Sequence, residues 1–333
     1  MHKTPPETLR LPLPQDAADL LFVSLSRDPP PFKSLSLQSN GNFSGPIEDI
    51  RHGKKGKFSG IFIHQSCNGL LLCSTFQRRS YYLLKPTTKQ HVALHPPPSY
   101  ASSPYKRLFG LFGFHIAFDP SKSPHYKAIC VSWADIRRYQ IEIYSSETRR
   151  WSVSGNKFKG RRDVHIFTEG VFWNGNIHWI GAWLRFNVDL ECLERMPAGP
   201  VCRRDSRRLR GNRYFGESNG HLHLIQELSK EFRVFEMERD YSGWFVKYHV
   251  DLGGVVPGFP VIAHSILGVI RQENEDESFL LLNVPGKVVS YNLKDGTLKE
   301  LLNLAPEEKI GVRRAPPFRY YDTYQYIETL APV

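Results

Sequence analysis

The chain has 333 residues, of which 41% are hydrophobic and 23% are charged. This composition is typical of a folded globular protein and excludes a disordered chain. Aromatic residues make up 13%, and 25 Gly and 24 Pro are spread through the sequence. Aromatic strands broken by Gly and Pro turns indicate a β-rich fold rather than a helical one.

The cysteine content indicates a protein of a reducing compartment. There are five, none of them in a C-x-x-C pair, which disfavours a zinc knuckle. The residues after Met1 form no apolar run of the kind found in a secretory signal. We therefore expect free thiols and a cytoplasmic or nuclear protein.

No membrane partner is expected. The longest uncharged stretch, residues 252–270, is interrupted by Pro257 and Pro260, whereas a membrane helix of that length is uniformly apolar. No pattern for a cofactor is present, and none is predicted.

The formal net charge is +11, and much of the excess lies in one arginine-rich segment. Its members are Arg203, Arg204, Arg207, Arg208, Arg210 and Arg213. Such a segment is either a solvated loop or a surface that binds an acidic partner protein. Nucleic acid is a weaker candidate, because no RNP-type aromatic motif accompanies the arginines.

In chain order, the first predicted element is a helix. It covers residues 15–25, follows Leu13 and Pro14, and has Asp16 as a candidate N-cap. Residues 29–60 are rich in Pro, Ser, Gly and Lys and are expected to be a linker that grades into a β domain. The N-terminal leader is therefore predicted to be helical or disordered.

Hairpin turns dominate the rest of the chain. Asn-Gly, the strongest short hairpin signal, occurs at 40–41, 68–69, 174–175 and 219–220, and Asp-Gly occurs at 295–296. Strand-like segments such as 70–72, 177–180 and 221–225 follow these turns.

A second unit also recurs, in which an aromatic or β-branched strand enters a polar turn and another strand leaves it. Its turns lie near residues 86, 147, 190, 239 and 295. A degenerate period of roughly 50 residues built from antiparallel strands favours a β-propeller of about six blades over residues 41–333. The alternative is a large β-sandwich or two smaller β domains.

Several phrases resemble plant F-box-associated domains. The segments that carry the resemblance, in family order, are 64–72 (HQSCNGLLL), 82–89 (YLLKPTTK), 113–127 (GFHIAFDPSKSPHYK), 141–148 (IEIYSSET) with Trp151, 170–179 (GVFWNGNIHW) and 324–330 (YQYIETL). The resemblance implies a kelch-like propeller that binds substrate proteins. In full-length relatives, an F-box binds Skp1 and joins a cullin-based ubiquitin ligase.

The N-terminus departs from that family pattern. Residues 13–27 are faintly similar to the start of an F-box, and Leu13, Pro14, Leu20 and Leu21 are what would remain of a Skp1 contact. The later F-box phrase is absent, and an F-box without its last helices cannot bury its own apolar face. The resemblance therefore assigns residues 1–40 to a degenerate F-box-like leader and linker, with Skp1 binding disfavoured, and residues 41–333 to the propeller domain.

Catalytic patterns are weak, and we expect a protein-interaction module rather than an enzyme. Gly216–Gly220 matches G-x-S-x-G, but a nucleophile elbow needs a helix after it, and here an alternating strand follows. His221 and His223 share one strand face but do not make a metal site alone. The alternative remains a propeller-fold hydrolase or carbohydrate-binding protein.

Two tryptophans are candidate anchors for a partner. Most of the six are expected to pack between blades, whereas Trp183 and Trp244 lie near predicted loops and are the weaker packing candidates. The identity of the partner protein is not encoded in any recognisable motif.

Overall fold

The architecture was analysed in a computed structural model, which describes 15 stretches of the chain. These are residues 18–23, 32–36, 42–43, 61–75, 80–88, 90–95, 97, 113–135, 138–159, 166–199, 213–228, 231–251, 265–284, 287–303 and 323–327. Within them the protein is built from antiparallel strands, and its only helical elements are the single 3₁₀ turns η2 (Pro86–Thr88) and η4 (Glu275–Glu277).

Five of the sheets each consist of four strands that are consecutive in the chain. Counted from the centre of the ring outwards, the first sheet consists of β4 (Ile61–Cys67), β5 (Leu70–Thr75), β6 (Tyr81–Lys85) and β7 (Gln90–Leu94), and the second of β8 (Gly113–Ala117), β9 (Lys127–Asp135), β10 (Arg138–Ser145) and β11 (Arg150–Lys159). The third sheet consists of β12 (Gly170–Trp173), β13 (Asn176–Trp179), β14 (Leu184–Asn187) and β15 (Cys192–Arg195), and the fourth of β16 (Arg213–Ser218), β17 (His221–Leu228), β18 (Glu231–Met237) and β19 (Trp244–Asp251). The fifth sheet consists of β20 (Ser265–Ile270), β21 (Phe279–Val284), β22 (Lys287–Asn292) and β23 (Leu298–Asn303).

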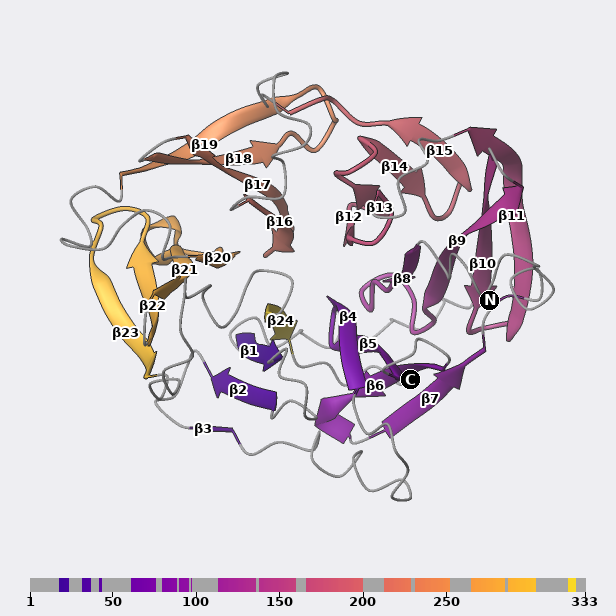
Figure 1. The fold of residues 1–333 in the computed structure, drawn as a ribbon, viewed down its shortest axis with the longest axis horizontal. Coiled ribbons are helices and arrows are strands. Elements are labelled where there is room, and N and C mark those ends of the chain that lie inside the picture. The colour runs from indigo at the N-terminus through magenta and orange to yellow at the C-terminus, as the bar shows by residue number, and fades with distance from the viewer. Residues whose placement is uncertain are drawn as a thin grey trace, which may run out of the picture.

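A sixth sheet in the described part of the chain joins both ends of the protein. Its strands, in order, are β24 (Thr323–Ile327), β1 (Ala18–Val23), β2 (Phe32–Ser36) and β3 (Asn42–Phe43). β24 contacts β4 on one side and β20 on the other, so the innermost strands form a closed ring (Figure 1). Closure leaves only short outer edges exposed, which is how propellers avoid unpaired strand edges. The predicted all-β propeller is confirmed.

The predicted N-terminal helix is wrong. Residues 18–23 form β1, which pairs with β2 on one side and with β24 on the other; for example, Leu20 lies opposite Leu35 and Gln325. A short apolar run fits either a helix or a buried strand, and helix propensities differ by less than about 1 kcal/mol per residue. Backbone pairing with the two neighbouring strands, β2 and β24, outweighs such a preference for helix. Residues 32–36, expected to be linker, are β2.

The Asn-Gly hairpins are confirmed where the structure describes them. Asn68, Asn174 and Asn219 have φ values of 45°, 47° and 49°, and the glycine after each is also at positive φ. Each turn joins the first strand of a blade to the second. The turn at 40–41 lies outside the described residues. The second recurring unit is also confirmed, since its five turns join the third strand of a blade to the fourth.

Large side chains fill the space between neighbouring blades. One cluster joins Ile129, Ile141 and Ile143 to Trp179 and Phe186 across the interface between β8–β11 and β12–β15. Trp179 and Phe186 are almost completely buried, so each contributes about 2–3 kcal/mol of hydrophobic burial. As predicted, Cys67 and Cys73 are small buried residues, and the four described cysteines are free thiols.

Candidate functional site

The turns between first and second strands and those between third and fourth strands emerge on the same side of each antiparallel sheet. We call this side of the ring the turn face. Side chains at these turns connect neighbouring blades: Asn68 Nδ2 donates to Phe118 O at 2.7 Å, and Trp173 Nε1 donates to Gly220 O at 2.8 Å. These two hydrogen bonds tie turns of the turn face to the neighbouring blade.

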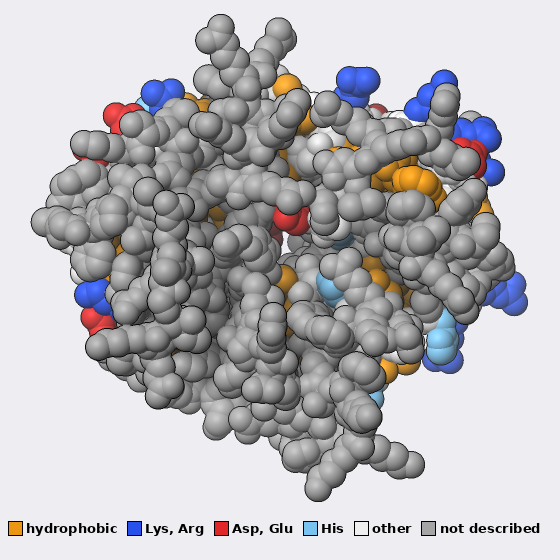
Figure 2. Space-filling model, viewed as in Figure 1, with side chains coloured by type: hydrophobic (Ala, Val, Ile, Leu, Met, Phe, Trp, Pro, Cys, Tyr) orange, Lys and Arg blue, Asp and Glu red, His pale blue; other side chains and the backbone are white. Residues whose placement is uncertain are grey.

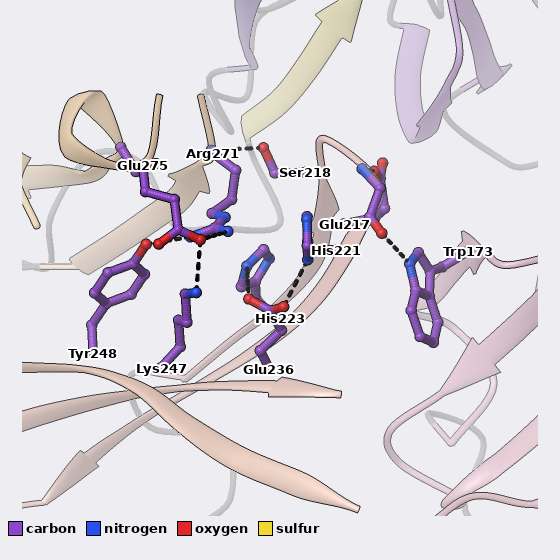
Figure 3. A network of polar contacts seen from close by, with 12 residues as sticks. Trp173, Glu217, Ser218, His221, His223, Glu236, Lys247, Tyr248, Arg271 and Glu275 are labelled. Atoms are coloured by element: carbon purple, nitrogen blue, oxygen red, sulfur yellow. Dashed lines mark hydrogen bonds and ion pairs between the residues drawn. The ribbon is translucent and has the colours of Figure 1, made fainter. Parts of the chain in front are cut away.

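A network of charged side chains on this face lies between β16–β19 and β20–β23 (Figure 3). Arg271 follows β20, and its backbone N–H donates to Ser218 Oγ at 3.1 Å. Its Nη1 donates to the Tyr248 hydroxyl, and its Nη2 lies 2.9 Å from Glu275 Oε1. The guanidinium is thereby fixed between two blades, with the side chain only 4% exposed.

Glu275 is shared by two cations. Lys247 Nζ, from the outer strand β19, lies 2.8 Å from the same Oε1 that Arg271 contacts. The hydrogen bonds from Lys247 and then Arg271 hold the pKa of this carboxyl below its usual range. Glu275 belongs to η4, whose N-cap Asn274 accepts from the backbone N–H of Asp276. The carboxylate is therefore presented by a capped turn and remains ionised.

A second polar group joins His221, His223 and Glu236. His221 Nδ1 lies 2.7 Å from Glu236 Oε1, whereas His223 Nε2 is 3.6 Å from Oε2, too far for a hydrogen bond. Burial disfavours the Glu236 charge, but the contact with His221 and the nearby His223 outweigh it and lower its pKa. Burial lowers the pKa of His223. The two rings thus stabilise one buried carboxylate.

A third group links β12–β15 to the following blade. His178 Nε2 lies 2.9 Å from the Tyr241 hydroxyl, and the guanidinium of Arg185 lies 3.7 Å above the Tyr241 ring. Burial lowers the pKa of His178 to about 4, so the ring is neutral at pH 7. Arg185 also pairs with Glu194. The group fixes the turn that contains Tyr241.

Charge is distributed unevenly over the ring. In Figure 2, Lys and Arg side chains of the described residues lie at the outer rim, where acidic side chains also appear, and an acidic and a histidine side chain are visible near the middle. Glu217, at the end of β16, accepts from the backbone N–H of Gly220 at 2.7 Å, and burial raises its pKa.

The structure also locates the residues singled out from the sequence. Ser218 lies at the end of β16 and is followed by an Asn-Gly turn and strand β17, so the helix that a nucleophile elbow requires is replaced by a hairpin. Its hydroxyl is buried and accepts the Arg271 N–H. Among the described residues, no group of three or more His, Cys, Asp or Glu is arranged to hold a metal ion.

Trp183 and Trp244 are half-buried and pack against one cluster with Trp173 and Phe215. Trp244 Nε1 donates to Pro197 O at 3.1 Å. Their role as partner anchors stays a prediction. The predicted partner-binding arginines, Arg203, Arg204, Arg207, Arg208 and Arg210, and the first two residues of the predicted Skp1 contact, Leu13 and Pro14, lie outside the described residues.

Sequence reasoning missed the group formed by Arg271, Lys247, Tyr248 and Glu275. The available signal was an arginine directly after a buried strand and just before the acidic run 273–277. It also missed Glu236 as the partner of His221 and His223. That pairing depends on the register of β17 with β18, in which His223 lies opposite Glu236.

Comparison with known proteins identifies the class. Residues 35–192 match the F-box associated beta propeller domain family. The F-box protein At5g07610 of Arabidopsis thaliana is 32% identical over 325 residues, an alignment that covers 82% of this chain and 71% of that protein. The chain therefore belongs to the plant F-box-associated β-propeller proteins.

Solved structures show only distant similarity. A protein from Lactobacillus plantarum has 11% identity and a TM-score of 0.42, covering 86% of this chain and 82% of its own. An oligogalacturonate lyase in complex with manganese has 10% identity and a TM-score of 0.43, covering 88% of this chain and 76% of its own. Likeness at this level carries no argument about what this chain binds.

A search of the described residues for a helix able to cross a membrane found none of sufficient length and apolar character.

Proposed function

We propose that this chain is a protein-interaction module that recognises a target protein, as the propeller part of an SCF-type ubiquitin ligase adaptor does. The observation that carries the proposal is its 32% identity to a plant F-box protein over 71% of that protein. An adaptor of this kind performs no chemistry, because it acts by raising the effective concentration of its target near the ligase. We place it in the cytoplasm or nucleus.

The polar groups of the turn face support a binding role over hydrolysis. A glycoside hydrolase on a propeller needs two carboxylates that converge on a substrate, one of them free to take up or release a proton. Here Glu236 is engaged by His221, and Glu217 accepts from the backbone of Gly220. Both carboxylates therefore serve local structure.

Skp1 binding through the N-terminal segment is disfavoured. Leu20 and Leu21 lie in β1, and their backbones pair with β2 and β24. An F-box is helical, so Leu20 and Leu21 can contact Skp1 as part of an F-box helix only if β1 leaves the sixth sheet. We expect target binding without capture of Skp1 through this segment.

The test is affinity purification of the tagged chain from plant cells treated with a proteasome inhibitor, followed by lysine crosslinking and mass spectrometry. The control is Tyr326→Asp, which places a charge at a buried position of the closing strand. We expect a protein that is crosslinked to the propeller of the unmodified chain and that the control does not recover. Absence of such a protein refutes target recognition. Recovery of Skp1 with the chain, lost on Leu21→Asp, refutes the expectation for the N-terminal segment.

A further inference from the structure

The group around Arg271 has the form of an anion site that is filled from within the chain. Two cations from different blades, Arg271 Nη2 and Lys247 Nζ, converge on one oxygen of Glu275 at 2.9 and 2.8 Å. Within the described residues, the second oxygen of that carboxylate makes no hydrogen bond or ion pair. One oxygen thus carries both charged contacts.

The guanidinium of Arg271 is only half used by this internal ligand. Its Nε and Nη2 form the edge that a carboxylate grips with both oxygens. Nη2 is taken by Glu275, but Nε has no hydrogen-bond partner within the part of the chain that the structure describes. A buried, unpaired guanidinium N–H is costly, so this edge favours a carboxylate that binds both nitrogens.

Arg271 and Glu275 differ in how firmly their side chains are held. Arg271 is fixed by Ser218, by the Tyr248 hydroxyl and by burial, with 4% of its side chain exposed. Glu275 is 57% exposed, and Lys247 is 23% exposed. Ion pairs that reach solvent contribute little stability, so Glu275 can leave at small cost, whereas the cationic side is preorganised.

We propose that Arg271, Lys247 and Tyr248 form a carboxylate-binding site on the turn face, which an acidic side chain of the target protein occupies by displacing Glu275. The incoming carboxylate accepts from Nε and Nη2 of Arg271, and Lys247 pairs with its solvent-facing side. The inference rests on the proposed function, since it names the chemistry of the target: a segment rich in Asp or Glu. The net charge of +11 favours such a partner.

The test uses a fluorescein-labelled octaglutamate peptide and fluorescence polarisation on the purified full-length chain at low salt. Lys247→Gln removes one cation of the site, and the matched control Lys294→Gln removes an exposed lysine that pairs with Asp276. We expect Lys247→Gln to weaken probe binding about fivefold and Lys294→Gln to change it less than about twofold.

A second pair of variants tests displacement directly. Glu275→Gln removes the internal carboxylate, and Glu277→Gln makes the same charge change in the same turn, at a carboxylate that accepts from Asn274 Nδ2. We expect Glu275→Gln to tighten probe binding about threefold to fivefold, because the competitor is gone, and Glu277→Gln to leave it within about twofold. Both glutamates are exposed, so both variants are expected to fold.

Three results overturn the proposal: no measurable binding of octaglutamate, equal effects of Glu275→Gln and Glu277→Gln, or equal effects of Lys247→Gln and Lys294→Gln. The outcome is separable from the proposed function, because the probe assay needs no cellular partner. If the purification recovers a target but the paired variants do not differ, this site is wrong and target recognition stands. If the paired variants differ as expected but no target is recovered, the site stands and the proposed function fails.

Discussion

Acidification from pH 7 to pH 5 is expected to destabilise the propeller through two buried histidines. Burial lowers the pKa of His115 and of His178 to about 4, from an ordinary value of 6.5. The unfolded chain therefore binds more protons than the folded chain between these values, and stability is lost as the pH falls through this window. Above pH 6.5 the full stability is present.

The size of the effect follows from the two pKa values. A ring with pKa 6.5 unfolded and about 4 folded loses about 2 kcal/mol of folding free energy between pH 7 and pH 5. Two such rings give a loss of about 4 kcal/mol. His223, whose pKa burial also lowers, acts in the same direction.

The assay is urea denaturation of the full chain at pH 7, 6 and 5, monitored by tryptophan fluorescence. His115→Gln is expected to be less stable at pH 7, because His115 Nε2 lies 2.8 Å from Phe167 O and 3.0 Å from Trp179 Nε1. Its loss of stability on acidification, however, is expected to fall by about 2 kcal/mol.

His249→Gln is the matched control, since His249 is exposed on the outer strand β19. It is expected to keep the full dependence on pH. The reasoning is refuted if the stability of the unmodified chain is the same at pH 7 and pH 5, or if His115→Gln and His249→Gln show the same dependence.

Three further substitutions test the contacts between blades, each measured by urea denaturation at pH 7. Trp173→Phe removes the indole N–H that donates to Gly220 O and is expected to cost about 1 kcal/mol; an unchanged midpoint contradicts this. Gly170→Ala places a methyl group 2.6 Å from the His115 ring and is expected to cost about 1–3 kcal/mol; a change below about 0.5 kcal/mol contradicts this. Tyr326→Ala empties a buried position of the closing strand and is expected to cost about 3–5 kcal/mol; a loss below about 1 kcal/mol would show that β24 adds little to closure.

The local features of this fold were predictable from the sequence. Asn68, Asn174 and Asn219 mark turns because the backbone conformation that they adopt is disfavoured for most other residues. Each such turn joins strands adjacent in the chain, so nothing beyond the immediate sequence is needed to place it. The spacing of the second recurring unit, whose turns lie near residues 86, 147, 190, 239 and 295, then indicated the propeller.

The non-local features were not predictable in the same way. Leu20 lies opposite Gln325, a pairing that spans almost the whole chain and leaves no trace in residues 15–25. Arg271 and Lys247 come from different blades, so their meeting on Glu275 depends on how two sheets pack. His221 and Glu236 come together only once the register of two strands is fixed.

The sixth sheet has a consequence for how the protein is made. Strands β1, β2 and β3 are synthesised before the other five sheets, whereas β24, the strand that completes their sheet, is synthesised after all five. During translation, one edge of β1 therefore stays unpaired until β24 is synthesised, while the five intervening sheets form. We expect chaperone binding or proteolysis during synthesis to be concentrated at this unpaired edge of β1. A chain whose synthesis stops before residue 323 lacks β24, so its ring of sheets stays open.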